Sequence, residues 1–146
     1  MNKRIKITKD DLILQTVVSI LLPFAVMLAL FVILNGHISP GGGFSGGVIL
    51  GASFILHNTA FGSQRMERIL NDRSISVTMA MAIIVYGLLK TYSFMMGAAQ
   101  LETIIPLGTP GKILSGGLIL PLNICVGIIV SLSMYIFYSL YTRGEI

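Results

Sequence analysis

Four long runs of apolar residues, separated by shorter polar segments, dominate the chain. They cover residues 12–34, 44–61, 75–97 and 117–141. As helices rising about 1.5 Å per residue, runs of this length extend about 27 to 37 Å, and the hydrocarbon core of a bilayer is about 30 Å thick. The pattern therefore predicts an all-α integral membrane protein in which residues 1–146 form a single domain of four transmembrane helices.

Composition supports this fold class over a soluble one. Of the residues, 54% are hydrophobic and 11% are charged, far from the balance of a typical soluble domain. The charged residues also fall almost wholly between the apolar runs. This arrangement indicates discrete membrane spans rather than one large soluble core.

The basic residues predict an orientation. Most of them lie before the first run, between the second and third, or after the fourth: Lys3, Arg4, Lys6, Lys9, Arg65, Arg68, Arg73 and Arg143. The segments on the opposite side contain only Lys112. The positive-inside rule then places both termini in the cytoplasm of a multi-pass protein of the cell membrane. The net charge of +4 suits anionic lipid and does not require nucleic acid as a partner.

The sequence contains none of the common catalytic or metal-binding motifs of a stand-alone enzyme. The single cysteine, Cys125, lies inside the fourth run, which excludes an intrachain disulfide and a Cys-x-x-Cys metal site. There is no phosphate-binding loop, no Gly-x-Ser-x-Gly and no His-Glu-x-x-His. We therefore expect no metal, no cofactor and no enzymatic activity of the chain by itself.

The segment joining the first two runs is rich in glycine. Gly43, Gly47 and Gly51 recur at every fourth position, and in a helix this spacing aligns them on one face that lets another helix approach closely. We expect a neighbour within the chain or from another subunit to fill that face. The residues assigned to this structural and packing motif are Pro40, Gly41, Gly42, Gly43, Phe44, Gly46, Gly47 and Gly51.

The same segment carries a family resemblance. Residues 36–47 read Gly-His-Ile-Ser-Pro-Gly-Gly-Gly-Phe-Ser-Gly-Gly and follow an Ile-Leu-Gln-Thr-Val beginning at Ile13. This combination resembles the MnhB (or MrpB) subunit of the Mrp-type multisubunit sodium/proton antiporters. The resemblance implies an accessory membrane subunit of a monovalent cation (sodium)/proton antiporter, with other antiporter subunits as partners.

The start of the fourth run departs from that pattern. Many such subunits carry an acidic residue there, whereas residues 108–123 of this chain contain none. The variant looks like the branch in which the antiporter-like module is built into ferredoxin-linked membrane-bound hydrogenases or related respiratory complexes. The host could then be a redox-driven ion pump, with hydrogenase or iron–sulfur subunits as further partners.

Four polar residues are candidates for an ion path: His37, Lys90, Glu102 and Asn123. His37 could relay protons or line an ion entrance, or else hydrogen-bond the irregular loop around it. Lys90 could face a hydrated cavity and pair with Glu102, or extend its ammonium to the bilayer surface, or form a purely structural ion pair. Asn123 could hydrogen-bond across helices or hold a break in its own helix.

Two other functions remain to be weighed. An independent, homo-oligomeric small transporter is disfavoured, because proton-coupled exporters of that size resemble one another in carrying an acidic residue deep in the first span, and none lies within residues 12–34. A purely structural subunit, which assembles the complex without ion contact, is the third interpretation.

Overall fold

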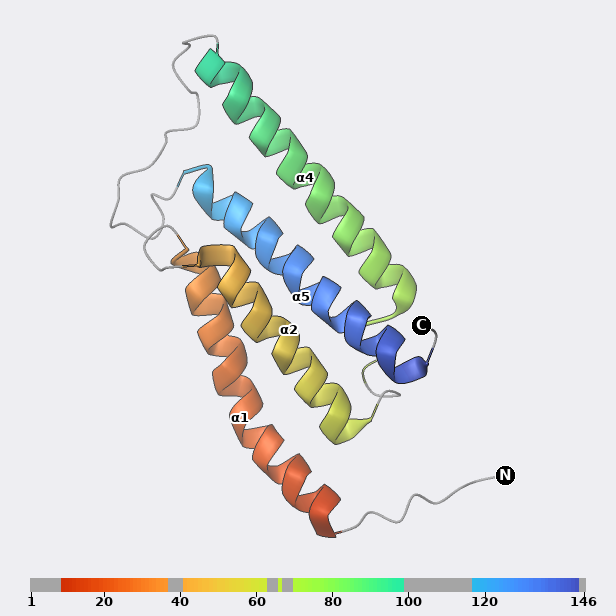
Figure 1. Ribbon diagram of the computed structural model, residues 1–146. Coiled ribbons are helices and arrows are strands. Elements are labelled where there is room, and N and C mark those ends of the chain that lie inside the picture. The colour runs from red at the N-terminus through yellow and green to blue at the C-terminus, as the bar shows by residue number, and fades with distance from the viewer. Residues whose placement is uncertain (1–8, 37–40, 63–65, 67–69, 99–116, 145–146) are drawn as a thin grey trace.

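Four helices of spanning length make up most of the computed structural model, which describes residues 9–36, 41–62, 66, 70–98 and 117–144. They are α1 (Lys9–Leu34), α2 (Gly42–Phe61), α4 (Asp72–Ala98) and α5 (Ile119–Arg143) (Figure 1). All four are long and apolar enough to cross a membrane. The predicted all-α class with four membrane-spanning helices is confirmed in this respect.

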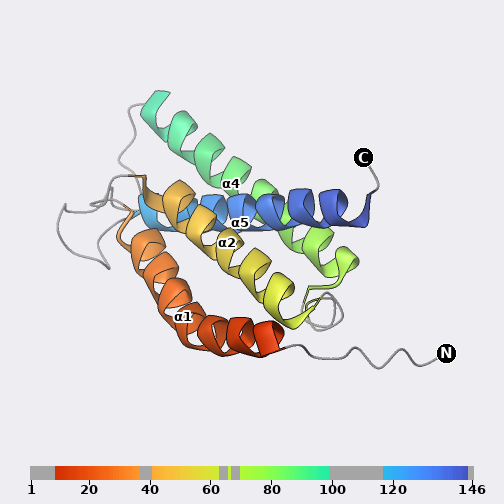
Figure 2. The same ribbon diagram turned by 60° about the horizontal axis from the view of Figure 1, so that its bottom comes forward.

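The helices follow one another across the molecule in the order α1, α2, α5, α4 (Figures 1 and 2). Helix α2 lies between α1 and α5, and α4 packs mainly on α5. We call the end where α1 and α4 begin and α2 and α5 end the termini end, and the opposite end the distal end. Helices α2 and α5 therefore run parallel, while α1 and α4 run antiparallel to them.

The helix ends differ by a few residues from the apolar runs, for local reasons. Helix α4 begins at Asp72, three residues before the third run, because a carboxylate in the first turn interacts favourably with the helix dipole. Helix α5 begins at Ile119 because Gly117, with a φ of 50°, still belongs to a turn. Hydropathy detects the membrane-embedded part of a helix and not its polar first turn.

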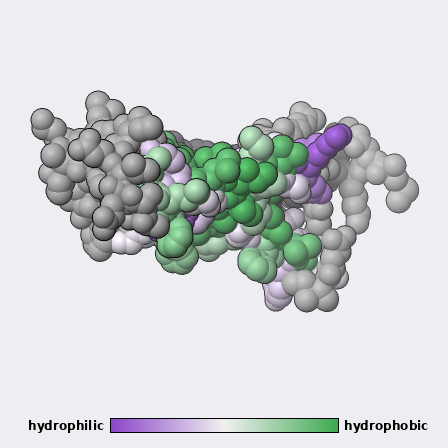
Figure 3. Space-filling model, turned by 90° about the horizontal axis from the view of Figure 1, so that it is seen from above, coloured by the Kyte–Doolittle hydropathy of each residue, from purple (hydrophilic) through white to green (hydrophobic). Residues whose placement is uncertain are grey.

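One apolar cluster fixes α4 against α5 near the termini end. Its buried members are Met66, Ile75, Leu132 and Tyr135. Elsewhere the surface is strongly apolar: Phe24, Phe94 and Phe137 are between 68% and 77% exposed. In the space-filling view the middle of the described surface is hydrophobic, and its most strongly hydrophilic residues lie toward one end (Figure 3). Such a surface is suited to lipid or to other membrane subunits.

Candidate functional site

The start of α2 has no side-chain cap from its own N-cap residue. Gly41 precedes the helix with a φ of 92° and offers no side-chain cap. Its carbonyl oxygen accepts hydrogen bonds from the N–H of Phe44 at 3.1 Å and of Ser45 at 3.3 Å. Positive φ at Gly41 and Gly42 is strained for any residue with a Cβ. These glycines therefore shape the entry into α2.

Asn123 of α5 completes this helix start. The N–H of Gly43 donates to the Asn123 Oδ1 at 3.4 Å. A Cβ added to Gly36, just after α1, would lie 2.5 Å from the Asn123 Nδ2, and one added to Gly42 would lie 3.2 Å from the Oδ1. We call Gly36, Gly42, Gly43 and Asn123 the asparagine corner. It joins the distal ends of α1, α2 and α5 around one amide side chain.

Below the corner, α2 and α5 touch along a regular seam. Gly47 faces Gly127, whose carbonyl oxygen would lie 2.8 Å from a Cβ at position 47. Gly51 faces Ser131, whose carbonyl oxygen would lie 3.1 Å from a Cβ at position 51. Like Gly43 and Asn123, each pair is separated by 80 positions. The face formed by every fourth glycine is thus filled by α5 of the same chain.

A different glycine of α2, Gly46, packs against α1. A Cβ on Gly46 would lie 2.9 Å from the carbonyl oxygen of Ala29 and 2.5 Å from the Cγ1 of Ile33. Since Gly46 and Gly47 are consecutive, their Cα atoms present different sides of α2. Helix α2 therefore packs backbone to backbone on two neighbours at once.

The structure separates the residues singled out from the sequence. Asn123 lies in the corner with Gly42 and Gly43, whereas the Phe44 side chain points outward and is 61% exposed. His37, Pro40 and Glu102 lie outside the described residues. His37 directly follows Gly36 in the chain, so it is attached to the corner covalently.

Lys90 is not part of the asparagine corner. Its side chain is exposed on α4, and in both ribbon views the distal half of α4 lies away from the distal ends of α1 and α2 (Figures 1 and 2). Among the described residues, no hydrogen bond joins Lys90 to Asn123.

Sequence reasoning missed three members of the corner and seam: Gly36, Gly127 and Ser131. A signal for two of them was present, because Asn123, Gly127 and Ser131 also recur at every fourth position. Small residues with this spacing on two helices of one chain favour their pairing. Gly36 has no such signal, because it lies after the end of α1.

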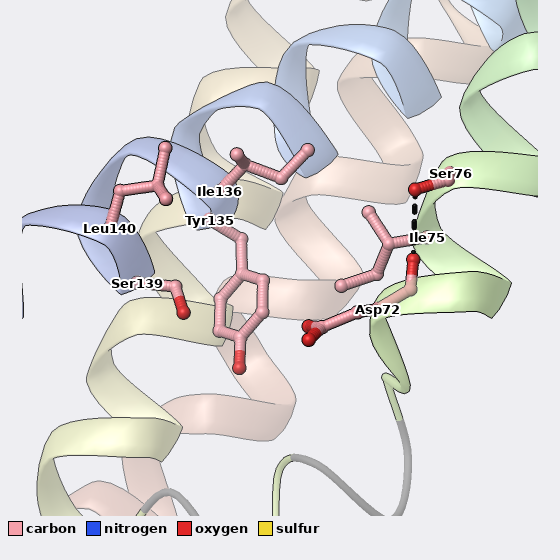
Figure 4. A pocket seen from close by; sticks show the side chains of 7 residues that line it. All are labelled: Asp72, Ile75, Ser76, Tyr135, Ile136, Ser139 and Leu140. Atoms are coloured by element: carbon pink, nitrogen blue, oxygen red, sulfur yellow. Dashed lines mark hydrogen bonds between the residues drawn. The ribbon is translucent and has the colours of Figure 1, made fainter. Parts of the chain in front are cut away.

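A second feature is a pocket of about 220 Å³ between α4 and α5 near the termini end (Figure 4). Its lining residues are Asp72, Ile75, Ser76, Tyr135, Ile136, Ser139 and Leu140. The Ser76 hydroxyl donates to the Asp72 carbonyl oxygen at 2.9 Å, and the Asp72 side chain extends toward the Tyr135 ring. Within the described ranges, no group of three or more potential metal ligands occurs. The pocket thus offers a mixed polar and apolar wall without a metal cluster.

Four helices of spanning length, held together by glycine contacts, one amide and one apolar cluster, define a multi-pass membrane protein without a cluster of metal ligands in its described part. Residues 13–136 match the family described as "Domain related to MnhB subunit of Na+/H+ antiporter". The chain belongs to this family. The resemblance to the MnhB subunit of the Mrp-type antiporters is thereby confirmed.

Of two similar relatives, one carries the name of an antiporter subunit. The chain is 35% identical over 111 residues to "Uncharacterized protein MJ1307" of Methanocaldococcus jannaschii, covering 70% of this chain and 41% of that protein. It is 33% identical over 75 residues to "Putative antiporter subunit mnhB2" of Staphylococcus aureus (strain Newman), covering 51% of each. The matched part thus spans about half or less of the length of these relatives.

Proposed function

We propose that this chain is an accessory, non-catalytic subunit of a multisubunit monovalent cation (sodium)/proton antiporter. It lies in the cell membrane with its termini end toward the cytoplasm. The observation that carries the proposal is the match of residues 13–136 to the MnhB-related family, and the α2–α5 seam supports an accessory rather than a self-associating role. Gly43, Gly47 and Gly51 are occupied inside the chain, so the motif builds a compact subunit and is not available for packing one copy on another.

The distribution of acidic residues argues against an independent transporter. In the described helices, Asp and Glu occur only at positions 10, 11 and 72, at helix starts. A carrier that exchanges cations for protons needs an acidic group at depth in the membrane, which can hold a cation and a proton in turn. Because these helices supply no carboxylate there, ion movement depends on partner subunits.

We further propose that the asparagine corner borders a cation path on the distal side of the membrane. The Asn123 Oδ1 already accepts one long hydrogen bond, at 3.4 Å, and a carbonyl oxygen has capacity for a second partner. His37, attached next to Gly36, would supply a titratable group to the same path. Lys90 and Glu102 would adjust the electric field that a passing cation experiences.

Transport measurements on the whole complex test this path. His37→Ala and Glu102→Gln should each reduce cation-dependent proton movement in everted membrane vesicles while the complex remains intact. His57→Ala is the matched control, because His57 is the second histidine and lies near the other end of α2. Normal transport by both variants in an intact complex would refute the proposed cation path and favour a purely structural subunit.

The subunits that co-purify with the chain would identify its host complex. A tagged chain should be purified in mild detergent from its own membrane and its companions identified by mass spectrometry. Antiporter subunits alone support a self-standing antiporter, whereas additional hydrogenase or iron–sulfur subunits would make the module part of a redox-driven pump. Recovery of the chain only with itself would refute the accessory-subunit proposal.

A further inference from the structure

The distal half of α4 exposes a lysine on an otherwise apolar face. Ile83, Gly87, Lys90 and Phe94 are all exposed and follow one another at spacings of three or four residues, which places them on one side of a helix. We call these four residues the Lys90 face. A Cβ added to Gly87 would meet nothing within 4 Å, so the face has a notch beside its only charge.

Lys90 lies at a depth where a charge needs a partner. The candidate span of α4 is Asp72–Met96. At 1.5 Å per residue, Lys90 lies about 9 Å from the middle of this span, toward the distal end. Half of a hydrocarbon core is about 15 Å. The Lys90 Cα is therefore inside the apolar layer, where an unpaired ammonium is unfavourable.

The geometry of the helix disfavours escape of this ammonium to the nearer bilayer surface. Side chains in an α-helix lean toward its N-terminus, which for Lys90 means toward Gly87 and the middle of the membrane. The distal surface lies the other way, and Phe94, one turn further in that direction, is 77% exposed on the same face. The lean of the helix thus favours a position of the ammonium over the Gly87 notch.

Nothing in the described part of the chain neutralises this charge. Lys90 forms no hydrogen bond or ion pair with a described residue, and the Asp72 carboxyl lies at the opposite end of α4. The contacts of α4 with α5 involve Ile75 and Met79, near the termini end, and leave the Lys90 face open.

We infer that the Lys90 face is the contact site for a transmembrane helix of another subunit, and that this helix carries an Asp or Glu opposite Gly87. A carboxylate supplies the missing countercharge, and the absence of a side chain at Gly87 lets the partner backbone approach closely enough to bring it there. Lipid fills a notch without supplying a fixed anion at this depth. The inference rests on the proposed function, because it requires a hetero-oligomeric complex.

Co-purification of the intact complex provides the first test. Lys90→Glu should lower recovery of one partner subunit more than about tenfold, because like charges across an interface are strongly unfavourable. Gly87→Leu should have a similar effect by filling the notch. Lys90→Arg keeps the charge, and Ala52→Leu enlarges an exposed small residue of α2; both should retain the partner. Full recovery with Lys90→Glu and Gly87→Leu would overturn the inference.

Photo-crosslinking tests the contact without depending on subunit stability. Benzoylphenylalanine at Thr91, which adjoins the Lys90 face, should crosslink to a membrane-spanning peptide that contains Asp or Glu. Exchanging that acid for lysine should then restore assembly of the Lys90→Glu chain. Crosslinks only to lipid, to a second copy, to residues 99–116 of the same chain, or to a helix without an acid would each contradict the inference.

The two proposals fail in distinguishable ways. If the unaltered chain retrieves no other subunit, the accessory function itself is wrong. If the unaltered chain retrieves its partners and the Lys90 and Gly87 variants do so equally well, only the docking site is wrong.

Discussion

Asn123 performs from another helix the task that a capping side chain usually performs locally. Helix α2 starts at Gly42 without a side-chain cap, so its first N–H groups have no carboxylate or hydroxyl of their own to bond. The Asn123 Oδ1 accepts the Gly43 N–H across 80 positions of sequence. The cap therefore couples the start of α2 to the position of α5 as well as satisfying a donor.

Removing this amide should loosen the distal end. Asn123→Ala leaves the Gly43 N–H without its acceptor and should lower the free energy of unfolding by about 1 to 2 kcal/mol, as loss of a helix cap does. The measurement is an SDS titration of the purified chain in mild detergent. Asn35→Ala is the control, because among the described residues the Asn35 Nδ2 bonds only the Phe31 carbonyl oxygen of the adjacent α1, at 2.9 Å. Equal effects of the two variants would show that the interhelical bond has no special role.

At the level of single residues, the sequence predicted the kind of interaction better than the residue that takes part in it. Asn123 was recognised as a group that could hydrogen-bond across helices, because an amide inside an apolar run requires a partner. Its acceptor role toward Gly43 was not predictable, since it depends on how two distant helix starts are brought together. The notch at Gly87 was missed for a similar reason: a lone glycine in a run has no meaning until its surroundings are known.

Among the elements, the α2–α5 pair is the most tightly determined. Both helices carry small or polar residues at every fourth position, and these residues meet in register from Gly43 to Gly51. The spacing of the α2 glycines predicted that another helix approaches closely. It did not identify α5, because the corresponding pattern of Asn123, Gly127 and Ser131 mixes three residue types and is weaker than a run of glycines.

Adding a methyl group should affect the two sides of this seam unequally. At Gly43 the new Cβ would collide with the Asn123 backbone oxygen, which has no rotamer to change, so Gly43→Ala should cost about 3 kcal/mol. At Gly127 it would meet the Cδ1 of Ile33 at 2.8 Å, a flexible side-chain end. Alanine also favours a helix by about 1 kcal/mol over glycine, so Gly127→Ala should be nearly neutral.

Unfolding in SDS compares these two variants directly. A loss at Gly127→Ala as large as at Gly43→Ala would mean that Ile33 is as rigid as backbone. If both variants were neutral, the close approach of α2 to α5 at the corner would be wrong.

An apolar cluster attaches α4 to α5 near the termini end. Ile75 is only 4% exposed against Leu132 and Tyr135 of α5, whereas Val77 on the same helix is 56% exposed. Ile75→Ala should cost about 2 kcal/mol, the lower part of the range for a buried isoleucine, because lipid reduces the hydrophobic contribution but not the loss of packing. Val77→Ala should change the same SDS midpoint little. Similar shifts for both would show that the cluster does not hold α4.

For the whole molecule, the order α1, α2, α5, α4 produces a compact part and an extended part. Three helices are joined by glycines and the asparagine corner, while α4 is fixed near the termini end and exposes Lys90 further along. The number of spans was readable from hydropathy because each run is long and free of charge at its centre. The neighbours of each helix were not, since all four are apolar on every side.

Orientation in the membrane is the property of the whole chain that remains a prediction. The structure places the ends of α2 and α5 together, next to Gly62 and Gly144, both exposed. The basic residues favour this end for the cytoplasm. In a Cys125→Ala background, cysteine at Gly62 or Gly144 should therefore react in intact cells with a membrane-permeant maleimide only. Cysteine at Thr109, between α4 and α5, should also react with an impermeant reagent.

The labelling reports only the introduced cysteine, because replacement of Cys125 removes background labelling. Cys125 is itself buried, at 7% exposure. Reversed labelling would show that the predicted orientation is wrong and that the Asp72 pocket lies on the outer side of the membrane. The fold would be unaffected by this result. Labelling of Gly62→Cys and Gly144→Cys from opposite sides would be more serious, because two helix ends that adjoin in the structure cannot lie on different faces of one membrane. That result would contradict the parallel packing of α2 and α5, and with it the asparagine corner on which the proposed cation path depends.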